Sequence, residues 1–515
     1  METTAAAKKE AFPVKQLSIL LAVRLVEPLA VNSIVPYLFP MVKFLAPALS
    51  DIEATKRVTL LFSVYAFAQF GTNIAWGRLS DRVGRRPTML FGLVGVFVGT
   101  LGFGLSTSIP ALFVFRLVAG LLSGNVVITR AIIGDIVRDR QNKARAFAWN
   151  QTAYQIGQVI GPIIGGYLVE PCTQVPALCR GGRFAWLASH PYALPNLVIA
   201  VMIATSFFTA FFFLNETLPQ NVLKPSAPTS EQSPLLRPDS DSALETWKTA
   251  GPSHSKLSVL LSPQVRHIVV SYACLALHSF CFDQVFPVFL STGPNPSSSL
   301  PFGLRGGLGY NAPLVANLIA ASGILSIFFM VVLFTPVDKH YGTLLCMRAS
   351  MVLFPLVYVF LPYLVVLPEA PHWVRLAGVS AVIAMKTLAA VFAFNGNAVL
   401  LTVAAPWPGS LGLVNGVAQT AAAGARAIGP AILGVVIGWG DSMGSDALGW
   451  WFLALVAMGG AVQAFWRRRR RGLGGGMKPG PVEIKMHDTA HLLVPGKVAI
   501  APIIVVDPGN LELSH

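Results

Sequence analysis

Ionisable residues inside long apolar stretches are the residues of this sequence best suited to chemistry. Arg24 and Glu27 are three residues apart, so they would share one face of a helix. In apolar surroundings such a carboxylate could bind and release a proton, or it could form a structural ion pair with the arginine. Arg116, Asp283 and Arg426 also fall within apolar stretches. We predict that these five residues line a central site for protons or a charged solute.

A charged segment of ten residues, 77–86, lies between two of the apolar stretches and has the sequence GRLSDRVGRR. It contains five charged residues and two glycines. Such a segment is too short to fold alone and too charged to enter lipid. We therefore predict that it turns at a membrane surface.

The composition of the 515-residue chain indicates that most of it lies in a membrane. Apolar residues make up 54% and charged residues 12%, against roughly 25% charged residues in a soluble domain. The net charge of +15 is confined to short loops and one tail, so we expect no nucleic-acid partner. The five cysteines lack CxxC spacing, and we expect no metal and no cofactor. Cys172 and Cys179 share one loop, where a disulfide and two free thiols both remain open.

A membrane-spanning helix needs roughly 20 mostly apolar residues, and we find twelve such stretches. The prediction is an all-α membrane protein with twelve transmembrane helices in two six-helix halves. The expected spans are 17–41, 58–77, 88–106, 110–132, 147–169, 195–214, 266–291, 311–335, 343–367, 374–401, 409–438 and 446–466.

Polar segments divide the chain and indicate its orientation. Lysine and arginine concentrate in the loops after spans 2, 4 and 8 and in the tail, which predicts that these segments and both termini are cytoplasmic. The segment between spans 6 and 7 is rich in Ser and Pro, so we expect a disordered linker. The predicted units are an N-terminus 1–16, a six-helix bundle 17–214, a linker 215–265, a second six-helix bundle 266–466 and a tail 467–515.

The two predicted halves carry related motifs at corresponding places, such as Asp81–Gly84 after span 2 and Asp338–Gly342 after span 8. Segment 77–86 also matches the pattern GxL[SA]DRxGR[RK], and in this it resembles the signature loop of the major facilitator superfamily. The resemblance implies two bundles around a central site near the membrane midplane, and transport by alternating access.

In that family the loop locks the cytoplasmic side, so the resemblance implies a gate. We expect Asp81 to face the N-terminus of span 11, where free N–H groups favour an anion, and Arg85 to pair with Asp135. A solvated, positively charged turn is the alternative. The full set of predicted gate residues is Gly77, Asp81, Arg82, Gly84, Arg85, Arg86 and Asp135.

Span 5 resembles the GxxxGPxxGG motif of the drug–proton antiporter branch of the family. Glycines at this spacing let helices touch closely and the proline bends the helix, so helix packing unrelated to transport direction is the alternative. Arg24–Pro28 and Asn215–Pro219 resemble fungal members near the zinc-induced facilitator-like group. The residues of the span 5 motif are Gly157, Gly161, Pro162, Gly165 and Gly166.

Arg116 begins an RxxxG sequence that resembles a second motif of the family, linked there to proton transfer. A lone arginine in lipid is costly, so we expect it to face the protein interior. The alternative is a position at the outer membrane boundary, because Pro110 is only six residues away. Glu27 is the first candidate for the proton carrier and Asp283 the second.

The sequence predicts a secondary active transporter, not an enzyme, that moves a small molecule in exchange for protons. The alternative is a transporter-like nutrient sensor that binds a solute without net transport. The expected partners are a small-molecule substrate, protons and membrane lipid, and we expect a monomer. Two acidic dileucine patterns, at 231–236 and 488–493, leave a vacuolar and a plasma membrane location open.

Overall fold

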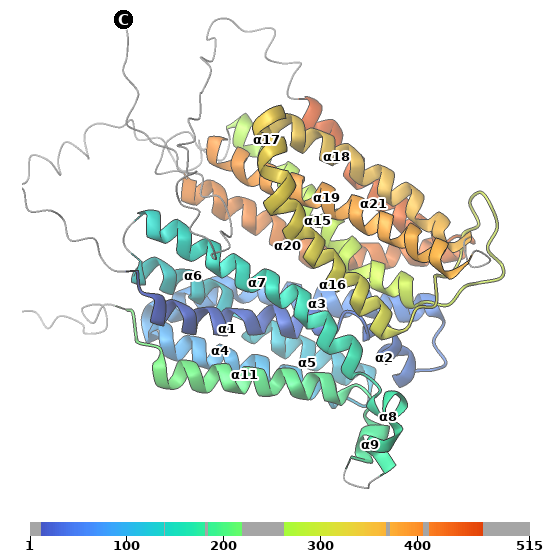
Figure 1. Cartoon of the computed structure of the whole chain (residues 1–515), viewed down its shortest axis with the longest axis horizontal. Coiled ribbons are helices and arrows are strands. Elements are labelled where there is room, and N and C mark those ends of the chain that lie inside the picture. Colours follow the sequence, from blue (N-terminus) through green and yellow to red (C-terminus); the bar gives the residue numbers. More distant parts are fainter. Residues whose placement is uncertain are drawn as a thin grey trace, which may run out of the picture.

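The computed structural model describes residues 12–137, 140–180, 184–218, 262–366, 371–404 and 411–466. Most of the predicted linker and the whole predicted tail lie outside these residues. The described chain is mostly helical, and its long helices run side by side in two bundles (Figure 1). The helices of the first bundle are α1 (Val14–Ser33), α2 (Leu38–Leu45), α3 (Asp51–Val83), α4 (Arg85–Gly104), α5 (Ile109–Leu122), α6 (Asn125–Ile136), α7 (Arg140–Leu168) and α11 (Ala193–Phe213).

The second bundle follows the undescribed part of the linker. Its members are α15 (Pro263–Ser291), α16 (Ala312–Phe328), the π-helix η1 (Phe329–Phe334), α17 (Thr335–Tyr341), α18 (Thr343–Phe360), the 3₁₀-helix η2 (Leu361–Val366), α19 (His372–Ala404), α20 (Leu411–Ser442) and α21 (Leu448–Trp466). Three short helices between α7 and α11 extend from one end of the first bundle: α8 (Pro171–Gln174), α9 (Pro176–Arg180) and α10 (Trp186–Ser189).

The predicted all-α membrane architecture is confirmed. In the described part of the chain, 10 helices are long and apolar enough to span a membrane, or up to 11 if the bent pair α1 and α2 counts as one span. The predicted span 147–169 corresponds to α7, which is 29 residues long. It contains four glutamines, Gln141, Gln151, Gln155 and Gln158, so it is more polar than most of the other long helices.

Several helices extend beyond the apolar stretches that predicted them. Helix α3 begins at Asp51, because Ser50 and Glu53 form a capping box with hydrogen bonds of 3.2 Å in both directions. It ends before Gly84, whose φ of +117° is not a helical value. The predicted extent of 58–77 was therefore too short, since capping side chains and not hydropathy determine where this helix starts.

Two predicted spans are broken. The first divides into α1 and α2, which are bent by 52°, and Pro36 in the break has no N–H to continue the helix. The fourth divides into α5 and α6 at Ser123 and Gly124. A Cβ on Gly124 would lie 2.3 Å from the indole of Trp76, so only glycine fits where α3 crosses this break.

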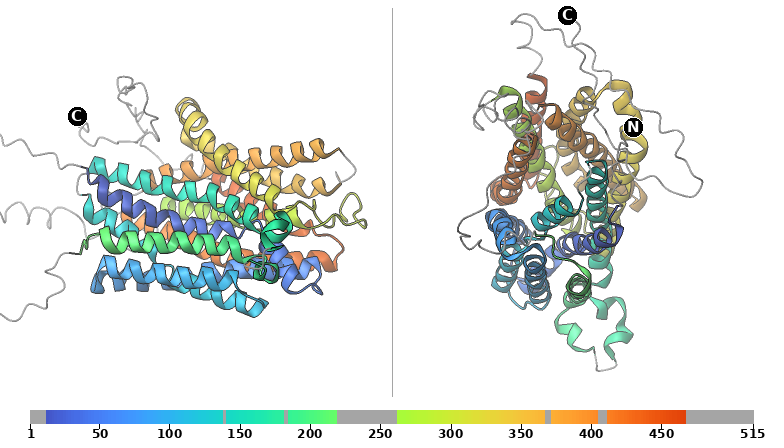
Figure 2. Two further views of the ribbon diagram at one scale, coloured as in Figure 1. Left: turned by 60° about the horizontal axis from the view of Figure 1, so that its bottom comes forward. Right: turned by 90° about the vertical axis from the view of Figure 1, so that its left-hand side faces the viewer.

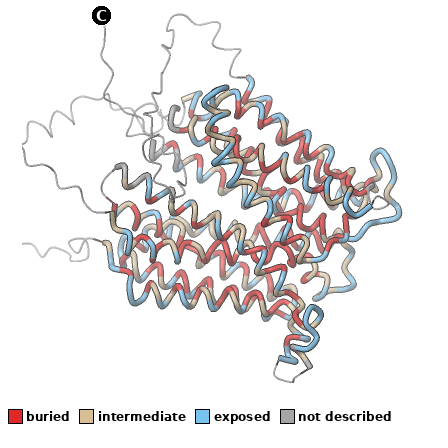
Figure 3. Tube along the Cα trace, viewed as in Figure 1, coloured by how far each residue is buried: buried red, intermediate tan, exposed pale blue. Residues whose placement is uncertain are grey.

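Each bundle buries its own apolar core. Buried residues follow the inner sides of the helices, and exposed residues follow the outer sides (Figure 3). Leu20 and Met89 are fully buried in the first bundle, as are Phe354 and Tyr358 in the second. Large apolar residues such as Phe212, which is 68% exposed, cover the outside, as expected for helices that contact lipid.

Close contacts between the two bundles lie toward the end of their shared face opposite segment 77–86. The view along the helices in Figure 2 shows them as two groups, joined by α3 against α20 and α7 against α16. Cβ atoms on Gly434 and Gly166 would lie 2.4 Å from Thr59 and 2.3 Å from Ala316. Gly416 lies five turns from Gly434 on the same face of α20, and a Cβ on Gly416 would meet nothing within 4 Å. The space between the bundles is therefore open toward the end that carries segment 77–86.

Candidate functional site

Segment 77–86 forms a tight junction between α3 and α4. Gly84 joins the two helices in a conformation that other L-residues rarely adopt. A Cβ at this position would also lie 2.7 Å from a carboxylate oxygen of Glu216. The glycine is therefore required both by its backbone conformation and by the close approach of Glu216.

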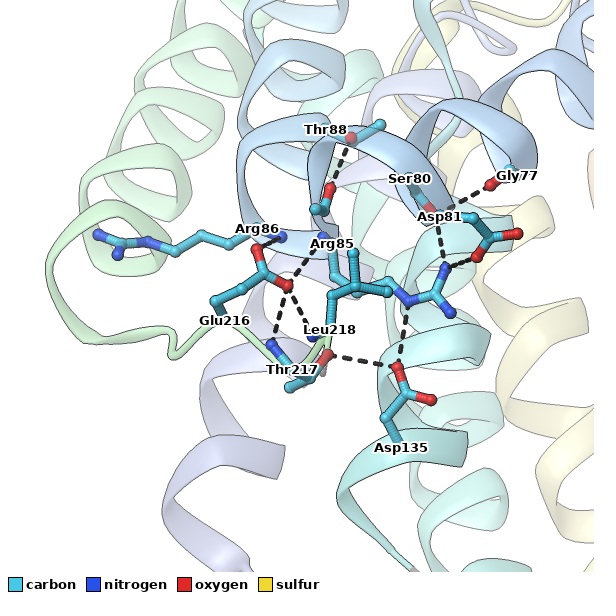
Figure 4. Close-up of polar contacts among 11 residues, drawn as sticks. Gly77, Ser80, Asp81, Arg85, Arg86, Thr88, Asp135, Glu216, Thr217 and Leu218 are labelled. Carbon is cyan, nitrogen blue, oxygen red and sulfur yellow. Dashed lines mark hydrogen bonds and ion pairs between the residues drawn. The ribbon is translucent and has the colours of Figure 1, made fainter. Parts of the chain in front are cut away.

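Arg85 is the centre of this junction. Its guanidinium donates to Ser80 Oγ at 2.7 Å and to Asp135 Oδ2 at 3.1 Å, and it forms an ion pair with Asp81 (Figure 4). The predicted pair with Asp135 is thus present, and it ties the start of α4 to the end of α6. Among the described residues the ionic partner of Asp81 is Arg85. The predicted approach of Asp81 to span 11 is not seen in this conformation, in which the bundles lie apart at this end.

Glu216, just after α11, completes the junction and was not among the predicted gate residues. Its carboxylate accepts hydrogen bonds from the backbone N–H groups of Arg85 at 2.9 Å and Arg86 at 3.0 Å, at the N-terminus of α4 (Figure 4). It also accepts from the N–H groups of Thr217 and Leu218, both at 2.9 Å. Burial alone would raise the pKa of Glu216, but these four hydrogen bonds lower it below its usual range. The free N–H groups at the N-terminus of α4 carry partial positive charge, which also favours the ionised carboxylate.

The other predicted gate residues have more peripheral positions. Arg86 donates to the carbonyl of Phe211 in α11 and lies 5.7 Å from its ring centre. Gly77 packs on α6, where a Cβ would contact Val127 at 3.7 Å. Arg82 is exposed.

The predicted pair of Arg24 and Glu27 is buried in the middle of α1. Arg24 Nη1 donates to Glu27 Oε2 at 3.0 Å, and the two side chains are 7% and 11% exposed. The other carboxylate oxygen accepts from Gln69 Nε2 at 2.9 Å and Ser123 Oγ at 3.1 Å. The break between α5 and α6 places Ser123 at this site. Arg24 also lies over the ring of Tyr154, 4.9 Å from its centre.

The glycine motif of α7 packs directly on this part of α1. Cβ atoms on Gly157 and Gly161 would approach Pro28 at 2.5 Å and the carbonyl oxygen of Leu29 at 3.2 Å. On Gly165 a Cβ would lie 1.7 Å from the carbonyl oxygen of Ser33. Gly166 faces α16 of the other bundle, and Pro162 lies inside α7. The motif therefore holds α1, with Glu27 on it, next to the contact between the bundles.

Arg116 faces the interior, as predicted, and is 5% exposed. Its guanidinium lies 4.9 to 5.6 Å from the ring centres of three aromatic residues, Phe62, Tyr65 and Phe103. Nε and Nη2 have no hydrogen-bond partner in the described part of the chain. Arg116 thus sits in an aromatic cage apart from the ion pair of α1.

The second bundle contains a further ion pair. Asp283 of α15 pairs with Lys386 of α19, whose ammonium lies 5.0 Å from the ring centre of Phe282. The lysine is 10% exposed and the aspartate 52%. Arg426 of α20 is exposed and has no ion pair with any described residue.

Arg130 of α6 is a further charged residue that sequence reasoning missed. It is exposed, and it lies on a helix that packs on α1 and α3. A signal was present, since Arg116, Ser123 and Arg130 are seven residues apart in turn and would share one face of the continuous helix predicted over 110–132. Gln69 and Tyr154 offered no comparable signal, because their role depends on which helices pack on α1.

Two helical bundles that part toward the end carrying segment 77–86, with ion pairs inside the membrane region, define a secondary transporter. The chain belongs to the Major Facilitator Superfamily, whose sequence profile matches residues 29–430.

Relatives and solved structures agree with this assignment. The chain is 31% identical to the Major facilitator superfamily multidrug transporter mfsB of Aspergillus fumigatus, over 88% of this chain and 84% of that protein. It is 25% identical to the Protein ZINC INDUCED FACILITATOR-LIKE 1 of Arabidopsis thaliana, over 84% and 86% of the two chains. The solved structure of a D-xylose-proton symporter has the same fold, with a TM-score of 0.62 and 14% identity over 89% of this chain and 98% of that one.

Proposed function

We propose that this protein exports small organic compounds in exchange for protons. The observation that carries the proposal is Glu27, a carboxylate buried in the middle of α1 and bonded by Arg24, Gln69 and Ser123. These three donors come from α1, α3 and the break after α5. Relative movement of these helices would change the number of donors to the carboxylate, and with it the affinity for a proton.

The α7 motif supports exchange over simple uptake. Its glycines bring α7 against α1 within two turns of Glu27, and Gly166 brings it against α16. A movement of the bundles about this contact would therefore reach the proton site directly. The name of the fungal relative, a multidrug transporter, favours export of foreign compounds.

Transport in vesicles with an imposed pH gradient tests the proposal. Full-length protein in proteoliposomes should move rhodamine 123 or another exported dye uphill when the gradient is present, and the movement should stop when a protonophore collapses it. Uphill movement that is indifferent to the protonophore would contradict proton coupling.

The substitution Glu27→Gln tests whether Glu27 is the residue that carries the proton. It should abolish transport driven by the pH gradient and preserve exchange of labelled for unlabelled dye, because exchange needs no net proton movement. Asp283→Asn is the parallel variant for the second candidate. If Glu27→Gln still supports uphill transport, Glu27 forms a structural ion pair and the proton is carried elsewhere.

A further inference from the structure

A folded loop covers the closed end of the molecule, which is the end opposite segment 77–86. Residues 292–311 join α15 to α16 at this end and fold back over the last turn of α15 (Figure 1). The backbone N–H group of Tyr310, for example, donates to the carbonyl of Leu290 at 2.7 Å. Backbone hydrogen bonds therefore hold the loop in place as part of the closed end.

Asp446, in the turn between α20 and α21, binds this loop with both its backbone and its side chain. Its N–H group donates to the carbonyl of Leu304 at 2.8 Å, and its carboxylate Oδ2 accepts from the N–H group of Gly306 at 2.8 Å. The other carboxylate oxygen, Oδ1, is buried and has no hydrogen-bond partner in the part of the chain that the structure describes. A charged carboxylate with an unpaired oxygen away from water is costly, and a proton on that oxygen removes the charge.

Asp446 also lines a cavity of about 40 Å³ between the two bundles. The first bundle contributes Asp51 and Thr55 of α3 to its walls, and the second bundle contributes Phe289 and Trp450. Carboxylates of both bundles therefore line the same small space while this end is closed. When the bundles part here, as alternating access requires, each carboxylate meets water instead.

The charges around Asp446 come from the loop, from α20 and from the first bundle. Burial raises the pKa of Asp446, and the negative charges of Asp441 and Asp51 raise it further. The backbone hydrogen bond and the positive charge of Arg305 act in the opposite direction, but the pKa remains above its usual value. Asp51 itself pairs with Lys43 at 2.9 Å, so the lysine offsets part of its charge. The closed end thus holds a carboxyl group that binds a proton more tightly than it would in water.

We propose that Asp446 takes up a proton when the bundles close at this end, and that acid therefore holds this end shut. A carboxyl group whose pKa is higher in one conformation stabilises that conformation at low pH, and the effect is lost as the pH rises through that pKa. An exchanger that admits protons from this side needs such a coupling, because closure must follow proton binding. The inference goes beyond the exchange proposed above, since it adds a pH-sensitive latch at the end opposite segment 77–86.

A distance measurement between the bundles tests the latch. Nitroxide labels are attached to Ser108→Cys and His372→Cys, two exposed positions at the closed end of the first and the second bundle. Cys274, which is half-buried while the other free cysteines are buried, is replaced by alanine. Double electron–electron resonance on the full-length protein in nanodiscs then gives the label separation at about pH 8 and about pH 4.5. The share of molecules with the longer separation should fall at least about twofold in acid.

Asp446→Asn is the decisive variant. Its amide keeps an acceptor for the N–H group of Gly306 but carries no charge, so it should show the short separation at both pH values. Asp51→Asn should move the midpoint of the change to lower pH, because it removes a negative charge that raises the pKa of Asp446. It provides a second test if Asp446→Asn does not fold. Glu170→Gln is the matched control, since Glu170 is a carboxylate at the same end that bonds Tyr192 and lies outside the cavity, and it should respond to pH as the wild type does.

The proposal is overturned if the separation does not depend on pH, or if neither Asp446→Asn nor Asp51→Asn changes the response. The same measurement on Glu27→Gln separates the latch from the proposed proton exchange. If Glu27→Gln abolishes the response and Asp446→Asn leaves it intact, the proton carrier itself controls closure and the latch is refuted. If Asp446→Asn abolishes the response in a protein that shows no transport driven by a pH gradient, the latch is retained and the exchange is refuted.

Discussion

At the scale of single residues, two glutamates show how the surroundings of a carboxylate decide its role. Glu27 is buried and bonded by the side chains of Arg24, Gln69 and Ser123, which can move apart with their helices. Glu216 is exposed and bonded by four backbone N–H groups, two of them its own neighbours in sequence. The first arrangement suits a group that changes protonation, and the second suits a permanent anion that holds a helix start in place.

The substitution Glu216→Gln should weaken the junction between α3, α4 and the segment after α11. The amide keeps an acceptor oxygen but loses the charge, so we expect a loss of about 1 kcal/mol, the difference between a charged and a neutral hydrogen bond. Thermal unfolding of the purified protein should show a lower midpoint, and transport should slow. Asp441→Asn, which neutralises an exposed carboxylate at the other end of the molecule, is the control. Equal midpoints for the two variants would show that Glu216 does not stabilise the junction.

At the scale of helices, α7 connects the proton candidate to the contact between the bundles. One side of it packs on α1 through Gly157, Gly161 and Gly165, and Gly166 packs on α16. The same helix is polar for a membrane span, because four glutamines lie along it. Close packing by glycines therefore compensates for a weaker apolar surface.

Gly165→Ala should separate α7 from α1. The added methyl group would lie 1.7 Å from the Ser33 carbonyl oxygen, a contact that only a shift of the backbone can relieve, and overpacking of this kind costs roughly 1–3 kcal/mol. We expect a lower thermal midpoint and reduced transport. Gly71→Ala on α3 is the matched control, since a methyl group there meets nothing within 4 Å and alanine favours a helix. Two variants of equal stability would contradict the packing described for α7.

At the scale of the whole molecule, the two ends of the helical bundles differ in their charged residues and in their cysteines. The junction of α3 and α4 and its arginines lie at the end where the bundles part. Cys172 and Cys179 lie near the opposite end, on α8 and α9, and form a disulfide with Cα atoms 5.5 Å apart (Figure 1). Disulfides persist in oxidising compartments, and arginine-rich loops face the cytoplasm. Both features favour an orientation with the open end toward the cytoplasm.

Epitope tags test that orientation. Tags placed within 219–261 and after Arg471 should be reached by antibody only after the membrane is permeabilised, because both segments follow helices that end on the arginine-rich side. For protein in an organelle, protection from added protease replaces the antibody. A tag within 219–261 that is accessible on intact cells would reverse the orientation.

The sequence by itself determined the membrane architecture, the family and the local motifs of this protein. Spans follow from runs of apolar residues, and the ion pair of Arg24 with Glu27 follows from their spacing on one helix, since both depend on neighbours in the chain. The pair of Arg85 with Asp135 was predicted by resemblance to a family motif and is present.

Only the tertiary structure decided which distant groups meet. Gln69 and Ser123 bond Glu27, and Glu216 caps α4, through the packing of helices that are far apart in sequence. The breaks in spans 1 and 4 also depend on tertiary contacts, such as Trp76 against Gly124. A hydropathy pattern depends only on a residue's neighbours in the chain. The partner of a charged side chain depends on which helix faces pack together, and this is determined by the tertiary structure.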